Sequence, residues 1–158
     1  MPSSGLRDSM LTRLILGYGN PLRSDDGVGW KAAAALEREL SSADLLVVTS
    51  QQLTPEMAET LSRCSRVLFL DAAHTGSPGE IRMETVRRDP DARAGDVSHQ
   101  LLPPALLELA YRYFVVEPKA TLLTLAGENF EFGEHFSASV EHSWEAYLDR
   151  ARGWIHQL

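Results

Sequence analysis

The feature that most constrains the fold is the stretch 14–30, which reads LILGYGNPLRSDDGVGW. It begins with an apolar run typical of a buried strand, and this run stops at Gly17, before a segment rich in Gly, Asn, Pro and Asp. Over 28–40 strong helix formers dominate, and small or apolar residues recur at helical spacing. The sequence therefore predicts a strand, a sharp turn and a helix, with Asp25 and Asp26 held at the turn.

Turns of this kind often bind phosphate, because the backbone N–H groups at a helix N-terminus favour anions. Here Gly17, Gly19 and Gly27 do not form the G-x-G-x-x-G pattern, no Gly-Lys-Ser/Thr follows, and two carboxylates would repel an anion. Two interpretations stay open. Either Asp25 caps the helix and Asp26 complements the helix dipole, or one acid caps the helix while the other faces a cation.

Length and composition limit the class of protein. The 158 residues, 44% of them hydrophobic, are expected to form a single domain with a proper core, with a loose tail over 1–10. A net charge of -7 with scattered basic residues argues against a nucleic-acid partner. The lone Cys64 excludes an internal disulfide and is expected to be a small buried residue. With no apolar leader or membrane-spanning run, we expect a cytoplasmic protein without membrane contact, and a monomer.

Strands and helices alternate along the rest of the chain. Unalternating apolar runs predict strands buried on both faces, whereas the alternating run 80–86 predicts a strand with one wet face nearer an edge. Such alternation predicts an α/β domain of three α/β/α layers, in which helices flank both faces of a twisted, largely parallel sheet. Strands are expected near 11–16, 44–49, 66–70, 80–86 and 120–126, and helices near 28–40, 54–63, 103–113 and from 137 or 139 onward.

Three potential metal ligands follow or precede these elements. Ligands in parallel sheets sit at the carboxyl ends of the strands, where the loops that lead into the helices gather. Asp26 follows the first strand, Asp71 ends the third, and His99 precedes a helix. Two carboxylates and one imidazole suit a borderline divalent cation such as nickel or zinc. The spacing alone leaves a second interpretation open, in which Asp71 caps a turn and His99 is an ordinary loop histidine.

Three segments resemble the signature blocks of the hydrogenase maturation protease family, the endopeptidases that trim the C-terminal extension from the large subunit of nickel-iron hydrogenases. The blocks are GYGNPLRSDDGVG, VLFLDAAHTGSPGEI and VSHQLLPPALLELA, and their order and separations match as well. The resemblance extends from the first strand to the last helix. It implies that Asp26, Asp71 and His99 are the metal-binding and catalytic positions.

The resemblance also implies how such a protein selects its substrate. Nickel already inserted in the precursor large subunit would be what Asp26, Asp71 and His99 grip, so that only loaded precursors are cut; zinc or cadmium could occupy the same site in vitro. Our hypothesis is that the ion also polarises the scissile carbonyl or an attacking water. The chain has no G-x-S-x-G elbow and no H-E-x-x-H helix that would indicate another peptidase mechanism.

Several neighbouring residues are candidates for contact with the substrate. The segment with Gln51, Gln52 and Thr54 stands where many members have an Asp-Gly-Gly-Thr-like segment, and its QLTPE form resembles members that serve soluble hydrogenases. His74 follows Asp71 closely enough to line the same cleft. Asn20 is expected to hold the turn by hydrogen bonds from side chain to backbone.

Two other classes of function compete with the protease interpretation. A non-hydrolytic nickel-binding chaperone or sensor for hydrogenase assembly would use the same ligands without shortening the precursor. A small nucleotide-binding α/β module would explain the Gly-rich turn but would leave Asp26, Asp71 and His99 without a role.

Overall fold

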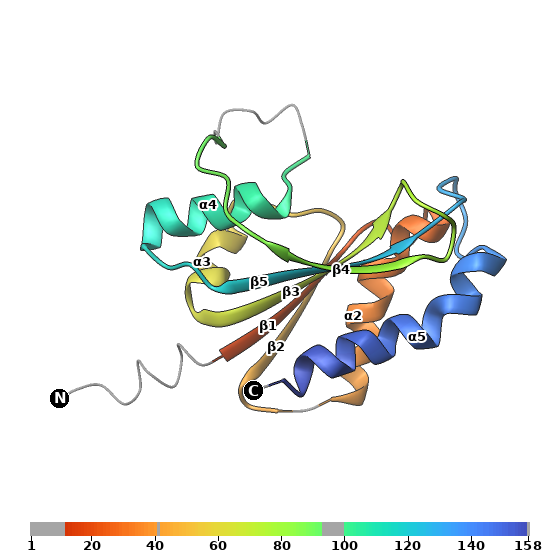
Figure 1. The fold of residues 1–158 in the computed structure, drawn as a ribbon, viewed down its shortest axis with the longest axis horizontal. Helices are drawn as coiled ribbons and strands as arrows, with labels where there is room; N and C mark the ends of the chain where they lie inside the picture. The colour runs from red at the N-terminus through yellow and green to blue at the C-terminus, as the bar shows by residue number, and fades with distance from the viewer. Residues whose placement is uncertain (1–11, 41, 93–99, 158) are drawn as a thin grey trace.

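The computed structural model describes residues 12–40, 42–92 and 100–157; the expected tail over 1–10 and His99 lie outside these ranges. A five-stranded sheet with the order β2-β1-β3-β5-β4 forms the middle layer. Helices α3 and α4 lie on one side of this sheet and α2 and α5 on the other (Figure 1). The expected three-layer α/β architecture is confirmed.

The sheet is parallel except at one edge. β1 pairs in parallel with β2 and β3, β3 pairs in parallel with β5, and β4 runs antiparallel to β5. The alternating segment is thus an edge strand, as its pattern predicts. The strand bounds are β1 Thr12–Tyr18, β2 Leu45–Ser50, β3 Cys64–Ala73, β4 Ile81–Val86 and β5 Lys119–Ala126.

The helices follow the predicted positions, with one addition before the first. Both acids of the turn lie in a short 3-10 helix, η1. The bounds are η1 Ser24–Gly27, α2 Val28–Glu39, α3 Met57–Ser62, α4 Pro103–Phe114 and α5 Ala138–Ile155. None of the helices in the described part of the chain is long and apolar enough to cross a membrane.

Each face of the sheet carries its own apolar core, because successive side chains of a strand point to opposite faces. Ile15 and Leu70 point toward the face covered by α2 and α5, where Tyr147 is fully buried and donates a 2.8 Å hydrogen bond to Leu123 O. Leu16 and Phe69 point toward the face covered by α3 and α4. Full burial of one such side chain is worth about 2 kcal/mol.

Two strands run further than their apolar runs suggest. β1 does not stop before Gly17 but continues through Tyr18, because its pairing with β2 extends to the Tyr18–Ser50 register. β3 does not end at Asp71 but continues to Ala73, where it still pairs with β5. Neighbouring strands therefore extend pairing beyond the point where the local sequence turns polar.

The prediction that the 44–49 strand is buried on both faces is wrong. β2 is an edge strand and all its residues are partly or fully exposed, with the Leu46 side chain 40% exposed. An apolar run reports the preference of single residues and not the number of neighbouring strands, so the same pattern fits a central strand and this edge.

The predicted start of α3 is also wrong. Thr54 does not cap a helix; Thr54 and Pro55 accept the N–H groups of Met57 and Ala58 in a turn, and the helix begins at Met57. The prediction failed because a Thr-Pro-Glu segment suits a turn as well as a first helical turn.

A close approach between α2 and the sheet places η1 over the strand ends. A Cβ atom on Gly29 would lie 2.0 Å from Leu70 O and 2.6 Å from Tyr18 O, so only glycine fits there. The first turn of α2 therefore rests directly on the carboxyl ends of β1 and β3. This contact brings Asp26 toward the segment that carries Asp71.

Candidate functional site

The two predicted carboxylates lie at the carboxyl ends of adjacent strands. Asp26 belongs to η1, directly after β1, and Asp71 lies within β3 opposite Thr124 of β5. Because β1 and β3 are neighbours, the two acids are close enough for the negative charge of Asp26 to contribute to the pKa of Asp71. The structure thus brings together two of the three predicted ligands.

The Asp26 carboxylate is held from both sides. Its Oδ2 accepts the backbone N–H of Asn20 at 2.9 Å, and its Oδ1 lies 3.5 Å from Nε2 of His74. The side chain keeps 26% of its surface exposed. Gly19 makes room for this turn, since it has a φ of +138° and a Cβ there would lie 2.0 Å from Asp26 O. The carboxylate is therefore oriented yet still accessible.

Asp71 is partly buried near the carboxyl end of β3. Burial raises its pKa to about 7, and the nearby charge of Asp26 raises it as well, although the Ala72 N–H and the Tyr18 hydroxyl hydrogen bond to the carboxylate and lower it. The Ala72 N–H donates at 2.8 Å. Burial and the charge of Asp71 raise the pKa of Tyr18 far above its usual value, so the hydroxyl stays protonated as a donor. A cation at Asp71 would offset the cost of its buried charge.

Asp25, next to Asp26, has a different role from either one expected. It does not cap α2, since no side chain caps η1 or α2. Its fully buried carboxylate accepts the backbone N–H groups of Glu128, Asn129 and Ser137 at 2.8 to 3.1 Å. Burial alone would raise the pKa of Asp25, but these hydrogen bonds bring it below its usual value. Asp25 therefore anchors the loop that leads into α5.

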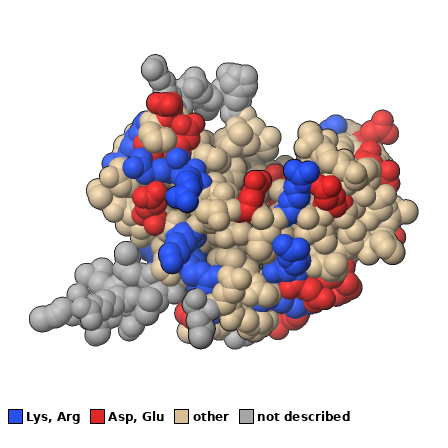
Figure 2. Space-filling model, viewed as in Figure 1, with Lys and Arg blue, Asp and Glu red and all other residues tan. Residues whose placement is uncertain are grey.

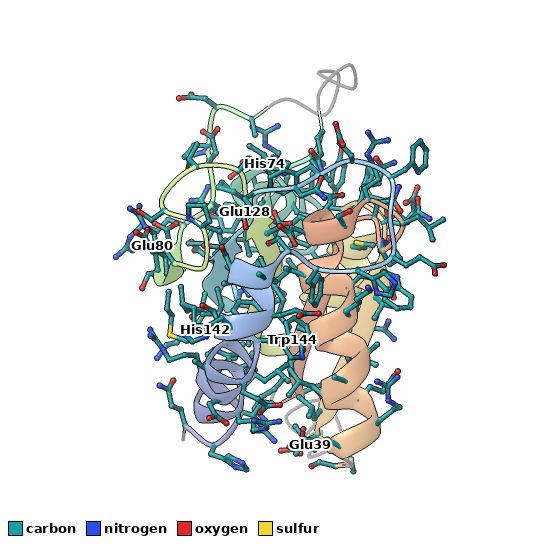
Figure 3. All side chains as sticks on the ribbon, turned by 90° about the vertical axis from the view of Figure 1, so that its right-hand side faces the viewer. Glu39, His74, Glu80, Glu128, His142 and Trp144 are labelled. Carbon is teal, nitrogen blue, oxygen red and sulfur yellow. The ribbon has the colours of Figure 1, made fainter. Side chains whose placement is uncertain are left out.

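That loop brings an aromatic ring to the site. Phe130 stacks on the imidazole of His74, with ring centroids 3.9 Å apart and an interplanar angle of 17°. Figure 3 shows His74 and Glu128 at one end of the molecule and Glu39, at the C-terminal end of α2, at the other. His74 is thus positioned by Phe130 with its Nε2 toward Asp26. Neither Tyr18 nor Phe130 was predicted as a site residue.

The remaining predicted residues follow the carboxyl ends of β1 and β2, or lie outside the described ranges. Gln51 and Gln52 are exposed and follow Ser50, whose carbonyl accepts the Gly19 N–H at 3.1 Å. Thr54 is half-buried just beyond them. The prediction for Asn20 is confirmed, because its Oδ1 accepts the Leu22 N–H at 2.9 Å.

Asp26 and Asp71 have carboxylate oxygens suited to a divalent cation, and their like charges favour one between them. Within 12–40, 42–92 and 100–157, no three or more His, Cys, Asp or Glu residues form a group that could hold a metal ion. A full ligand set therefore needs a donor from elsewhere, and the predicted third ligand His99 lies outside these ranges. The lone Cys64 does not supply one: it is buried, its thiol contacts Thr60 O, and burial raises its pKa to about 11.

The fold and this pair of strand-end acids define a class: a three-layer α/β domain with a carboxylate site beside its first helix. Comparison with solved structures makes this class more specific, because the chain has the fold of the hydrogenase maturation proteases. It is similar to the [NiFe] hydrogenase maturation protease HycI from Thermococcus kodakarensis, with a TM-score of 0.72 and 18% identity over 97% of this chain and 100% of that one.

Other solved structures of this kind agree. The hydrogenase maturating endopeptidase HybD from Escherichia coli gives a TM-score of 0.70 and 20% identity, covering 92% of each chain. A hydrogenase 2 maturation peptidase from a Thaumarchaeota archaeon gives 0.67 and 23% identity, covering 91% of this chain and 97% of that one. No protein-family model and no curated protein matches the chain.

Proposed function

We propose that this protein is an endopeptidase of hydrogenase maturation. It removes the C-terminal extension from the nickel-loaded large-subunit precursor of a nickel-iron hydrogenase. The observation that carries the proposal is the pair formed by Asp26 and Asp71, two acids at the carboxyl ends of the adjacent strands β1 and β3, close enough for the charge of Asp26 to raise the pKa of Asp71. The likeness of the whole fold to proteins described as hydrogenase maturation proteases supports it.

Nickel enters this proposal as part of the substrate. Asp26 and Asp71 would bind the ion presented by the precursor, and His99 would complete the ligand set. An oriented but accessible carboxylate suits this role, and the raised pKa of Asp71 means that an arriving cation relieves an unfavourable buried charge. Precursors without nickel would lack the group that these acids recognise. A bound divalent ion would polarise the scissile carbonyl or an attacking water.

The surroundings of the acids would position the precursor. His74 lies close enough to Asp26 to contact a ligand of the ion or the peptide beside it. Gln51, Gln52 and Thr54 follow the strand that ends next to Gly19, and would contact the extension. These four residues thus extend the proposed site away from the carboxylates in two directions.

The turn before α2 does not favour the nucleotide-binding alternative. Its backbone N–H groups are taken by the protein itself: Asn20 donates to the Asp26 carboxylate and Asp25 donates to Asn129 O. A phosphate would have to displace these acceptors and approach two carboxylates.

Intact-mass analysis of the precursor tests the proposal. A nickel-loaded large-subunit precursor from the same source is incubated with the unaltered protein, with Asp26→Ala, and with Glu37→Ala, which removes an exposed acid from the last turn of α2. We expect a single C-terminal truncation with the unaltered protein and with Glu37→Ala, and none with Asp26→Ala. No truncation by the unaltered protein, together with nickel-dependent binding of the precursor, would favour the chaperone or sensor alternative instead.

A further inference from the structure

Two apolar side chains lie exposed side by side at the rim of the site. The Leu22 side chain is 49% exposed and the Phe132 side chain 80% exposed. Arg23 and Gly133 form a parallel β-bridge, and Leu22 and Phe132 are the residues that precede the bridge on its two segments. Segments more than a hundred residues apart in the sequence therefore build one small apolar surface.

Hydrogen bonds hold this surface rigidly. The Ser24 N–H donates to Gly133 O at 2.8 Å, the Gly133 N–H donates to Leu22 O at 2.9 Å, and Ser24 Oγ donates to Glu131 O at 2.8 Å. Ser24 adopts a φ of +53°, a conformation that an L residue keeps only when its neighbours impose it. The loop therefore cannot readily fold inward to bury Leu22 and Phe132.

Contacts within the same two segments connect this surface to the carboxylates. The Asp26 N–H donates to Arg23 O at 3.1 Å, which places the surface one turn of backbone from the proposed ligand. Phe130, two residues before Phe132, stacks on His74, whose Nε2 faces Asp26. A polypeptide that presents a metal ion to Asp26 therefore has Leu22 and Phe132 within its reach.

Arg23 adds a positive charge to the same place. Its guanidinium lies 4.9 Å from the centre of the Phe132 ring. None of the ion pairs formed by the described residues includes Arg23. Aromatic and arginine side chains that lie exposed on a rigid frame are typical of protein-binding surfaces, and a guanidinium that forms no ion pair within the described residues suits a partner carboxylate.

We propose that Leu22, Arg23 and Phe132 form a docking ridge for the hydrogenase large-subunit precursor. This inference rests on the proposed function and adds where the partner binds. The ridge fits an apolar side chain of the precursor flanked by an acidic one, next to the place where the extension emerges. Docking at the ridge contributes to precursor affinity. It leaves the chemical step unchanged, because none of the three side chains is a proposed ligand of the metal ion.

The chain provides a matched control at the opposite end of the sheet. Tyr113, near the C-terminal end of α4, is 70% exposed and lies two residues from Val115, which is 76% exposed. α4 is followed by the amino end of β5, whereas the ridge lies at the carboxyl ends of the parallel strands. Loss of an exposed aromatic side chain can thus be compared near to and far from the site.

The experiment measures binding and cleavage of the nickel-loaded precursor separately. Binding to immobilised precursor gives Kd, and single-turnover cleavage with excess protein gives the maximal rate. The proteins are the unaltered chain, the double variant Leu22→Asn with Phe132→Ser, the conservative Phe132→Tyr, and the control Tyr113→Ser. We expect the double variant to raise Kd about 30-fold with the maximal rate within about 2-fold, and the other two to keep Kd within about 3-fold.

Each outcome decides between the two proposals. Equal Kd values for the unaltered and double-variant proteins would overturn the docking ridge and leave the endopeptidase standing. Binding lost only in the double variant, without cleavage by any protein, would support the ridge and overturn the endopeptidase. Absence of both binding and cleavage with the unaltered protein would overturn both. A thermal unfolding midpoint equal to that of the unaltered chain shows that the double variant is folded.

Discussion

Two regions of this molecule hold a carboxylate away from water in opposite ways. On α4, Glu108 is 5% exposed and lies 2.8 Å from Arg88 Nη1 and 2.6 Å from Arg112 Nε. At the strand ends, Asp71 is hydrogen bonded by Ala72 and Tyr18, and the charge from the described residues that acts on its pKa is that of another carboxylate, Asp26. Within the described residues, Glu108 is thus neutralised by two arginines, whereas Asp71 is hydrogen bonded but forms no ion pair.

The pKa values follow this difference. The hydrogen bond from Arg88 and then that from Arg112 lower the pKa of Glu108, whereas burial and Asp26 raise that of Asp71 to about 7. A buried charge that is paired within the chain serves the fold, and one left facing a like charge is typical of a binding or catalytic site. The comparison therefore supports the proposal that Glu108 serves the fold and Asp71 serves the site, without reference to any relative.

The largest expected effect comes from neutralising the strand-end acid. Asp71→Asn should reduce cleavage of the nickel-loaded precursor by at least about 100-fold, because a ligand to the ion is lost. The thermal unfolding midpoint should stay the same or rise, because a buried, repelled charge disappears. Single-turnover cleavage and thermal unfolding check both parts. A large fall in the midpoint would mean that Asp71 is structural and would break the comparison.

The opposite pattern is expected at α4. Glu108→Gln removes the buried carboxylate that Arg88 and Arg112 share and leaves Arg88 only the exposed Glu117, so the unfolding midpoint should fall by about 5 °C or more. Arg112 also donates to Pro90 O at 2.8 Å, which ties the segment after β4 to α4. Cleavage per folded molecule, measured well below the midpoint, should stay within about 3-fold. An unchanged midpoint would show that this buried pair contributes no stability.

The two acids should also respond to pH with opposite signs. Asp71 has a raised pKa in the folded protein, so its contribution to stability is fully present below the unfolded value of about 3.9 and is lost as the pH rises through about 7. In the presence of a chelator, the unfolding midpoint of Asp71→Asn minus that of the unaltered protein should therefore increase between pH 4 and pH 7. A difference that stays constant or decreases over this window would contradict the raised pKa of Asp71.

Glu108 behaves in the reverse manner, because its folded pKa is lowered. Its contribution is present above the unfolded value of about 4.3 and is lost as the pH falls through the lower folded value. The amount by which Glu108→Gln lowers the unfolding midpoint should thus be largest at neutral pH and become smaller in acid. Opposite trends for the two variants in one pH series would support the contrast between Asp71 and Glu108 more strongly than either trend alone.

Much of the fold follows from local pattern. Apolar runs that alternate with helical segments predicted the parallel three-layer domain, and the period-two run predicted β4 as an edge strand. β2 at the other edge was mispredicted, because its run of apolar residues carries no information about whether a further strand pairs with it. Strand order is a property of the whole chain, and that is why periodicity did not reveal it.

In the site too, local sequence predicts some residues, and others depend on contacts with distant parts of the chain. Asp26 and Asp71 could be proposed from the sequence because each follows or ends a predicted strand. The role of Asp25 could not, since the N–H groups that it binds belong to Glu128, Asn129 and Ser137, about a hundred residues away. Tyr18 was missed because β1 was expected to stop before Gly17. If the predicted first strand had continued to Tyr18, the alternation of side chains would have placed Tyr18 on the same face as Leu14 and Leu16.

The smallest effect expected is that of Tyr18→Phe, which removes only one hydroxyl beside Asp71. The pKa of Asp71 should rise further, because a donor to the charged form is lost, and the carboxylate should bind a cation less well. We expect cleavage of the loaded precursor to fall about 5-fold, with the unfolding midpoint lowered by at most a few degrees. Single-turnover rates across pH 6 to 9 provide the measurement.

If the loss is due to protonation of Asp71, it should shrink as the pH rises and the carboxylate ionises without help from the hydroxyl. A loss independent of pH would instead mean that Tyr18 supports the strand end sterically, and the difference between the two buried acids would then rest on Asp26 alone.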